Sequence, residues 1–365
     1  MIATADIDVT FSSETMVAYR IVPGLTEPQR TILPIPTPGP DEVLVKVLAS
    51  GVCHSDVHLL DWSATRPFSQ ATHTLGHEGA GIVVRLGERV AQETQTLSIG
   101  TYVAVLTTNA CEQPECSRCS RGFANVCFAR PMLGIGADGS WAEYVVARAS
   151  TVVPVPGNNP KSERLSPSVV AAATDAVMTP WHGLKRAARV RAGQTVLIFG
   201  CGGLGINAIQ IAKNVLGAGA VIACDIREES LTIARSLGAD YAIPPSALKA
   251  LLEEKGLAVD VAVDLVGKQV TLDAAMDVVR TGGVILLLGL GDDAVSVNPL
   301  AVTTKQLTIS GSFGGDFQDL EECLRAIDEG KVVPEVENRP LDECAQVIKD
   351  LAAGRIRTRI ALVPQ

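Results

Sequence analysis

The first 170 residues contain short apolar runs that are separated by turns. Runs of strand length lie at residues 42–50, 79–87, 101–107 and 142–148. Proline and glycine occur between them, as is typical of strand boundaries. Short strands with frequent turns predict a barrel-like β domain.

The pattern changes near Pro167. Residues 166–190 look helical and open at a Ser-Pro signal, with a break expected before Pro180. Continuous apolar runs such as TVLIFG (195–200) then alternate with helical segments such as LGINAIQIAKNVLG (204–217). This alternation predicts a parallel sheet with helices on both faces. From Asp316 onward we expect two helices and a final apolar strand that returns to the first domain.

Composition narrows the class of protein. The chain has 365 residues, 47% of them hydrophobic, which is enough for two domains. A formal net charge of −9 and the lack of a basic run argue against a nucleic-acid partner. No apolar stretch approaches the ~20 residues that a membrane span needs, and the N-terminus lacks the features of a signal peptide. We therefore expect a soluble, cytoplasmic protein with no membrane or nucleic-acid partner.

A glycine-rich stretch, VLIFGCGGLG, joins the first of these strands to its helix. Gly200, Gly202 and Gly205 have the G-x-G-x-x-G spacing, which allows a tight turn and the close approach of a pyrophosphate. Asp225 ends the next apolar run, where an acid can bond the ribose hydroxyls of NAD and would repel a 2′-phosphate. Arg227 weakens the preference for NAD, since it could pair with such a phosphate. The alternative is a glycine-rich turn that binds no dinucleotide.

Two groups of residues have the composition of zinc sites. Cys53, His77 and the adjacent Glu78 offer the sulfur, nitrogen and oxygen ligands of catalytic zinc, which keeps one coordination position open for substrate. Four cysteines in a short segment are typical of a closed, structural zinc site, and they are Cys111, Cys116, Cys119 and Cys127. Taken alone, Cys53 could be a small buried residue, and the four cysteines could be reduced thiols in a loop.

Several motifs occur together in the order found in one enzyme family. They are GVCHSDVH, GHEGAG, the four-cysteine segment, DGSWAEYV, GCGGLG and CDIREESLTIARSLGAD. The chain resembles the zinc-dependent medium-chain alcohol dehydrogenases, of the medium-chain dehydrogenase/reductase superfamily, over essentially its full length. The resemblance implies an α/β fold: a GroES-like β-barrel catalytic domain at residues 1–172 and 313–365, and an inserted Rossmann NAD-binding domain at residues 173–312. It also implies a homodimer or homotetramer, for which LTISGSF (307–313) is a candidate sheet edge.

The resemblance assigns the metal ligands residue by residue. It implies that Cys53 and His77 bind the catalytic zinc and that Glu78 can ligate it when the site rearranges. Asp175 matches the third protein ligand, because TDAVMTPWH offers no cysteine at that place. The alternative for Asp175 is an ordinary acid in the first turn of a helix.

The resemblance also implies a structural zinc on the four cysteines. The family separates its first two cysteines by two residues, whereas four residues separate Cys111 from Cys116, and Pro114 restricts that link. Whether the lengthened link still holds a metal is open at this stage.

Proton transfer and cofactor contacts are the remaining implied roles. Ser55 matches the hydroxyl that bonds the alcohol oxygen, and His58 matches the histidine that passes the proton outward through the cofactor ribose. Asp56 would support a zinc ligand. Cofactor contacts are expected from His54, Gly200, Gly202, Gly203, Leu204, Gly205, Asp225 and Arg227.

The resulting prediction is a reversible, NAD-dependent oxidation of a primary or secondary alcohol to an aldehyde or ketone by an enzyme with two zinc ions. A zinc-free enone or quinone reductase of the superfamily should lack Cys53 and His77. A sugar-alcohol dehydrogenase also fits these motifs, and a noncatalytic nucleotide-binding protein would need no proton relay through Ser55 and His58. The candidate pocket residues favour a bulky apolar or aromatic alcohol, and they are Trp62, Phe68, Trp141, Trp181 and Phe313.

Overall fold

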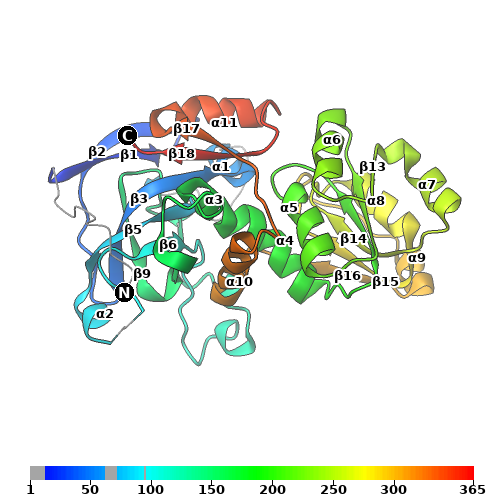
Figure 1. Cartoon of the computed structure of the whole chain (residues 1–365), viewed down its shortest axis with the longest axis horizontal. Coiled ribbons are helices and arrows are strands. Elements are labelled where there is room, and N and C mark those ends of the chain that lie inside the picture. Colours follow the sequence, from blue (N-terminus) through cyan, green and yellow to red (C-terminus); the bar gives the residue numbers. More distant parts are fainter. Residues whose placement is uncertain (1–12, 62–71, 94–95) are drawn as a thin grey trace. The chain divides into compact units, whose positions relative to one another are not determined.

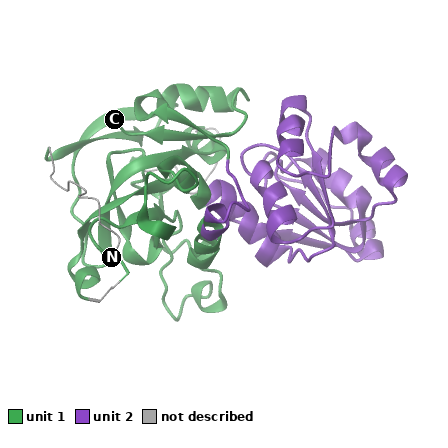
Figure 2. Cartoon of the chain, viewed as in Figure 1, with its two compact units in different colours: residues 1–174, 316–324, 335–365 green, residues 175–315, 325–334 purple. Residues whose placement is uncertain are grey.

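A computed structural model describes residues 13–61, 72–93 and 96–365, and the chain divides into two compact units. Unit 1 comprises Met1–Thr174, Asp316–Leu324 and Glu335–Gln365, and unit 2 comprises Asp175–Gly315 and Arg325–Pro334 (Figure 2). The domain boundaries expected at 172/173 and 312/313 stay a prediction. Two of the expected pocket residues, Trp62 and Phe68, lie outside the described residues.

Unit 1 is built around a seven-stranded sheet of order β10-β6-β5-β3-β18-β17, in which β9 also pairs with β3 (Figure 1). Its strands are β3 (Glu42–Val52), β5 (Gly79–Leu86), β6 (Tyr102–Val105), β9 (Tyr144–Arg148), β10 (Val152–Pro154), β17 (Val336–Pro340) and β18 (Arg359–Val363). A three-stranded sheet contains β1 (Thr15–Ile21), β2 (Gln29–Pro34) and β4 (His73–Thr74), and β7 (Met132–Leu133) pairs with β8 (Gly136–Ala137). The longest strand, β3, lies at the centre of the larger sheet and leads into the candidate site.

The last strand, β18, enters this sheet beside β3. Ile360 lies opposite Val52 in an antiparallel pair, so the tail does return to the first sheet. The tail also contains β17, which the apolar pattern did not predict because three of its five residues are exposed. The helices here are α1 (His54–Leu60), α2 (Glu88–Glu93), α3 (Pro167–Ala172) and α11 (Cys344–Ala352), and α10 (Phe317–Asp328) begins in unit 1 and ends in unit 2.

Unit 2 contains a six-stranded parallel sheet of order β13-β12-β11-β14-β15-β16. Its strands are β11 (Thr195–Phe199), β12 (Ala220–Cys224), β13 (Tyr241–Ile243), β14 (Val259–Asp264), β15 (Val279–Leu287) and β16 (Thr308–Gly311). Its helices include α4 (Met178–His182), α5 (Gly205–Gln210), α6 (Glu228–Ser236), α7 (Leu248–Lys255), α8 (Gln269–Val278) and α9 (Pro299–Lys305). Strand order reverses at β11, which lies between β12 and β14, and dinucleotides bind at such switch points. The predicted α/β fold with a doubly wound parallel sheet is confirmed.

The helical segment after Pro167 is continuous, and the break expected before Pro180 is wrong. Between α3 and α4 the chain forms a π-helical turn at Ala173–Val177, and Pro180 lies inside α4. Wider π-helical turns accommodate such irregularities and occur often at functional sites. No helix in the described part of the chain is long and apolar enough to cross a membrane.

Candidate active site

Cys53 lies at the junction of β3 and α1. Its backbone N–H donates to Oδ2 of Asp56 at 2.9 Å, and the N–H of Asp56 donates to the Cys53 carbonyl at 3.0 Å. This reciprocal cap explains why the helix begins here, because an acid in the first turn satisfies free N–H groups. The Cys53 side chain is 8% exposed, and its Sγ lies 3.7 Å from Oγ of Ser55.

His77 lies in the turn between β4 and β5, where glycines let other backbone come close. Gly76 has a φ of +93°, and a Cβ on Gly134 would lie 2.6 Å from the backbone nitrogen of His77. Nδ1 of His77 lies 3.2 Å from Oδ1 of Asp56. The carboxylate that caps α1 therefore also orients the imidazole and leaves Nε2 for a metal ion.

Glu78 is completely buried and forms an ion pair with a residue from the end of the chain. Nη2 of Arg359, on β18, lies 2.9 Å from Oε1 of Glu78, and Nη1 donates to the carbonyl of Val52 at 3.3 Å. A Cβ on Gly51 would lie 1.9 Å from Oε2 of Glu78, so only glycine leaves room for this carboxylate. Arg359 was not predicted from the sequence, where it is one cation in an apolar run.

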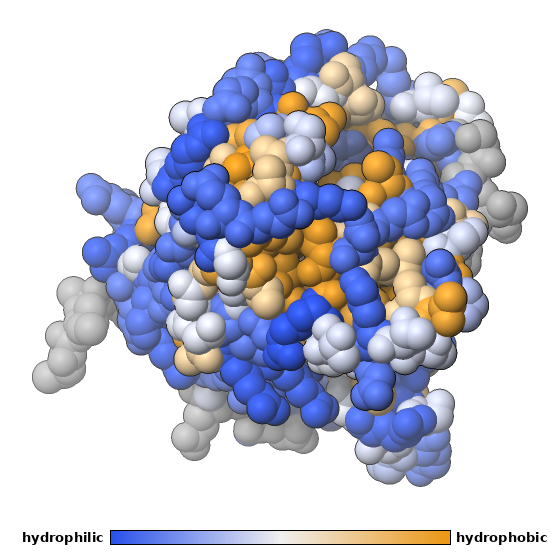
Figure 3. Space-filling model, turned by 90° about the vertical axis from the view of Figure 1, so that its right-hand side faces the viewer, coloured by the Kyte–Doolittle hydropathy of each residue, from blue (hydrophilic) through white to orange (hydrophobic). Residues whose placement is uncertain are grey.

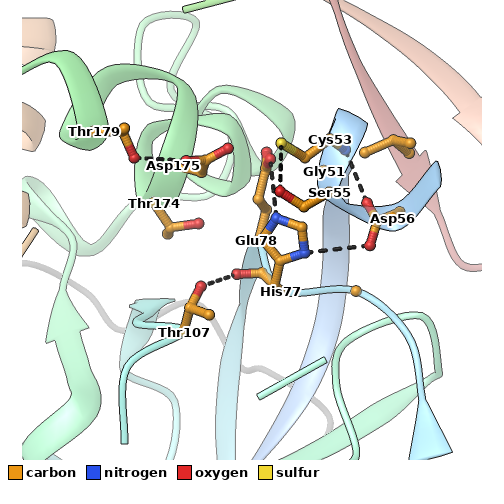
Figure 4. A network of polar contacts seen from close by, with 12 residues as sticks. Gly51, Cys53, Ser55, Asp56, His77, Glu78, Thr107, Thr174, Asp175 and Thr179 are labelled. Atoms are coloured by element: carbon orange, nitrogen blue, oxygen red, sulfur yellow. Dashed lines mark hydrogen bonds and ion pairs between the residues drawn. The ribbon is translucent and has the colours of Figure 1, made fainter. Parts of the chain in front are cut away.

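Asp175 follows Thr174 in the π-helical turn, and Oδ1 of Asp175 accepts a hydrogen bond from Oγ1 of Thr179 at 2.6 Å. Its other oxygen points towards Cys53 and Glu78 in Figure 4. One ligand atom from each of four residues, namely Cys53, His77, Glu78 and Asp175, lies within 4.8 Å of the others. The structure thus brings together all four ligands that the resemblance implied for catalytic zinc.

The charges around His77 favour a bound cation. Burial opposes protonation of the imidazole, but Asp56 and Cys53 raise the pKa of His77 well above its ordinary value. An environment that draws a proton onto a fully buried imidazole also attracts a metal ion. The sulfur, nitrogen and carboxylate donors are those of zinc sites, so the residues fit this metal.

The residues expected to transfer protons lie on α1. Ser55 is partly buried beside Cys53. His54 and His58 lie one helical turn apart with ring centroids 6.1 Å apart. His54 is exposed and His58 is half-buried, so this side of α1 is open to water.

The four-cysteine segment forms a second cluster, in which one ligand atom per cysteine lies within 4.8 Å of the others. Sγ of Cys111 lies 3.5 Å from that of Cys127 and 3.7 Å from that of Cys119. The longer first link is accommodated by a left-handed residue, Glu112, with a φ of +57°. Backbone N–H groups of Cys119 and Arg118 lower the pKa of Cys116 to about 6, which favours its thiolate, whereas burial raises the pKa of Cys119 to about 12. The lengthened link therefore still closes on one point.

In unit 2 the glycine-rich turn has the geometry expected for a dinucleotide. Gly200 has a φ of +90°, and a Cβ on Gly205 would lie 1.9 Å from the Gly200 carbonyl oxygen. A Cβ on Gly202 would meet only a side-chain atom of Arg227, at 3.9 Å, so this side of the turn is open for a phosphate. Gly203 follows, and Leu204 is the N-cap of α5.

Asp225 follows β12 and is 8% exposed. Its Oδ2 accepts from the N–H of Cys201 in the glycine-rich turn at 2.8 Å, and its Oδ1 accepts from the N–H of Arg227 at 2.9 Å. Nε of Arg227 lies 3.5 Å from Oδ1 of Asp225. The acid thus supports the glycine-rich turn, a role that sequence reasoning missed.

The expected pocket aromatics differ in exposure. Trp141 is fully buried and donates through Nε1 to the Gly51 carbonyl at 3.2 Å, so it supports the core below the site. Trp181 is 3% exposed, whereas Phe313 is 40% exposed. Among the described candidates, Phe313 therefore has the most exposed side chain.

Comparisons with known proteins agree with this geometry. Residues 39–157 match the family model of the alcohol dehydrogenase GroES-like domain, and residues 203–329 match that of zinc-binding dehydrogenases. The chain is 34% identical to an alcohol dehydrogenase from Geobacillus stearothermophilus over 328 residues, which is 88% of this chain and 91% of that protein.

Two solved structures show the same fold. Acetophenone reductase from Geotrichum candidum, in complex with NAD, has a TM-score of 0.84 and 32% identity over 97% of this chain and 98% of that one. A cobalt- and zinc-bound thermostable alcohol dehydrogenase from Pyrobaculum aerophilum has a TM-score of 0.81 and 26% identity over 96% of this chain and all of the other, 100%.

Proposed function

Since this chain belongs to the zinc-binding medium-chain alcohol dehydrogenase family, we propose that it oxidises a bulky primary or secondary alcohol, with proton transfer through Ser55 and His58. The family is that of NAD-dependent oxidoreductases acting on CH–OH donors, and the chain has a catalytic and a structural zinc site. The single observation that carries the proposal is the cluster of four ligand atoms around Cys53. Glycine-rich turns alone would suit many dinucleotide-binding proteins.

The bound cofactors supply the chemistry: zinc lowers the pKa of an alcohol hydroxyl, and the nicotinamide is the hydride acceptor. The side chains of the protein hold the metal ion in place and provide a path for the proton. Cys53, His77 and Asp175 hold the metal, while Asp56 fixes the imidazole ring. Oγ of Ser55 would accept the alcohol proton while its own hydroxyl proton passes on, through the cofactor ribose, to His58 and then to water.

Charge balance supports Asp175 rather than Glu78 as the resting third ligand. The Cys53 thiolate and the Asp175 carboxylate together neutralise a divalent ion. The Glu78 carboxylate is already balanced by Arg359 at 2.9 Å. Glu78 can therefore stay buried beside the metal without adding a net negative charge, which would weaken stabilisation of a developing alkoxide.

A substrate panel tests the activity. We expect NADH formation from secondary aryl alcohols such as 1-phenylethanol, with kcat/KM above that for ethanol by at least about tenfold, because an apolar pocket gains about 1–3 kcal/mol from added apolar groups. The similarity to an acetophenone reductase and the exposed Phe313 support this preference. Absence of NADH formation with every alcohol, by a protein that contains zinc, would contradict the proposal.

Replacing Ser55 with alanine tests the proton path. We expect kcat/KM for alcohol oxidation to fall about 10²–10⁴-fold, the usual contribution of positioned proton transfer. Zinc content and NADH affinity should be unchanged, because Ser55 neither ligates the metal nor contacts the glycine-rich turn in this proposal. Ser55→Thr keeps the hydroxyl and is the control. Equal activity of the alanine and threonine variants across pH 6–9 would rule out a role for this hydroxyl.

Replacing Asp225 with glycine tests cofactor choice. In the wild type, the ratio of kcat/KM for NAD to kcat/KM for NADP should exceed about ten. In the variant this ratio should fall by about 10–100-fold, because one or two hydrogen bonds to a charged group contribute that much to binding. NADP use should rise only modestly, since the variant also loses the hydrogen bond to Cys201 N–H. Arg227→Gln is the matched control. A wild-type preference for NADP would assign the selectivity to Arg227.

We also propose a homodimer or homotetramer that works in the cytoplasm. Strand β16 is the last in the order of its sheet, and Figure 3 shows apolar surface among polar side chains. Unit 2 has several exposed apolar residues. They include Val270, Leu290 and Leu300, each more than 60% exposed. Exposed apolar surface and an edge strand support pairing with a second copy. All nine cysteines are thiols, as suits a reducing compartment.

A further inference from the structure

Asn207 makes an unusual connection in unit 2. It lies in the first turn of α5 and is 1% exposed. Nδ2 of Asn207 donates to the carbonyl of Gly203 at 2.9 Å and to that of Ala176 at 3.1 Å, across 31 residues of sequence. One buried amide therefore joins the glycine-rich turn to the π-helical turn that precedes α4.

The Ala176 carbonyl needs this donor because of Pro180. In an α-helix a carbonyl accepts from the N–H four residues later, and the residue four positions after Ala176 is Pro180, which has no N–H. Asn207 supplies a donor that the local backbone lacks. Its own Oδ1 is buried and has no hydrogen-bond partner within the described part of the chain, so the side chain acts through its NH₂ group.

The π-helical turn is also the segment that carries Asp175. Thr179 holds the Asp175 side chain through a 2.6 Å hydrogen bond, and Asn207 holds the next carbonyl, that of Ala176. Side chain and backbone are thus fixed at adjacent positions. A shift of Asn207 would move this backbone and, with it, Asp175.

The other hydrogen bond of Asn207 ends in the turn that faces the cofactor phosphates. Gly203 lies between Gly202, which has open space for a phosphate, and the N-terminus of α5. Binding of a pyrophosphate orders the backbone amides of such a turn. The amide group of Asn207 therefore contacts the backbone of both turns.

We propose that Asn207 is a positioning residue that couples dinucleotide binding at the glycine-rich turn to metal binding at Asp175. The inference rests on the proposed function, in which Asp175 is a zinc ligand. Coupling between two binding sites is reciprocal, so a bound dinucleotide should retain the catalytic zinc and the zinc should strengthen dinucleotide binding by the same factor.

The test follows the loss of zinc from the holoenzyme to dipicolinate, with and without saturating ADP-ribose. ADP-ribose carries the pyrophosphate but no nicotinamide, so it cannot retain the metal by covering it with that ring. In the wild type we expect ADP-ribose to slow release of the more labile zinc by at least about fivefold, the lower end of typical coupling. In Asn207→Leu, which keeps the volume and removes the amide, the effect should fall below about twofold.

A double variant separates coupling from support of the helix. In Asn207→Leu/Pro180→Ala the new N–H at position 180 can bond the Ala176 carbonyl, but the connection to Gly203 stays broken. We expect the Tm, lowered in the single variant, to return to the wild-type value. The protection of zinc by ADP-ribose should stay absent.

Three results would overturn the inference. They are protection by ADP-ribose that persists in Asn207→Leu, protection that returns in the double variant, and no protection in the wild type. A wild-type enzyme that contains only the zinc of the four-cysteine cluster would overturn the proposed function as well as the inference. The zinc of the four-cysteine cluster is the internal control, because its release should not respond to ADP-ribose.

Discussion

Replacing Asp175 with alanine should remove the catalytic zinc and lower kcat/KM for alcohol oxidation by about 10³-fold or more. Lewis-acid activation contributes several kcal/mol to the transition state, and each 1.36 kcal/mol is about tenfold in rate. Without Asp175 the metal would keep Cys53 and His77, one protein ligand fewer than catalytic zinc usually has. Elemental analysis should find the structural zinc alone, while the fold survives and NADH still binds, more weakly by the coupling factor of about fivefold.

Glu78→Gln is the matched control for this result. Glutamine keeps the shape and can still accept a hydrogen bond from Arg359, so the metal should be retained. Activity should fall by about 10–100-fold at most, the usual effect of a group that supports a metal site without binding the metal. The opposite result would make Glu78 the third ligand. In that case Asp175→Ala would keep its full metal content and turnover within a few-fold of wild type, whereas Glu78→Gln would lose metal.

Replacing Arg359 with methionine should destabilise unit 1 by about 3–5 kcal/mol, because breaking a buried ion pair leaves one charge without its partner. Glu78 and Arg359 are both at most 7% exposed by side chain, so water cannot take the place of the guanidinium. The first calorimetric transition of the zinc-loaded protein should shift down by roughly 6–20 °C. Removing the guanidinium also makes the metal site more negative, so the variant should retain zinc at least as well as the wild type.

The double variant Arg359→Met/Glu78→Gln removes the charge that the single variant leaves behind. We expect it to regain most of the lost stability, because replacing both partners of a buried pair costs much less than replacing one. A Tm of the single variant within about 2 °C of wild type would mean that the metal ion, rather than Arg359, balances Glu78.

The clustering of Cys53, His77 and Glu78 could be predicted because each belongs to a short motif whose chemistry can be recognised without the fold. Cys53 and His77 follow strands and adjoin glycines, and the family resemblance placed Asp175 between the two halves of the chain. Arg359 could not be predicted in this way. Its partner is distant in the sequence, and an arginine in an apolar strand normally faces water. Only the pairing of β18 with β3 brings it beside Glu78.

The helical segment around Asp175 shows a different limit of sequence reasoning. Pro180 signals a missing N–H, and a helix break was the simplest expectation. The structure keeps the helix by widening it into a π-helical turn and by donating to Ala176 from Asn207. A side chain from another helix solved the problem, and propensities along one segment contain no information about such a donor.

The order in which the site is assembled follows from the position of β18. Strand β3, which ends one residue before Cys53, lacks one neighbour until residues 359–363 are available. A ribosome therefore releases the whole parallel sheet of unit 2 before the first sheet can be completed. Domains generally fold as they emerge, so unit 2 can form while Glu78 still has no counter-charge. Nascent chains that stop short of Arg359 should consequently expose an unfinished metal site to chaperones and proteases until β18 has paired with β3.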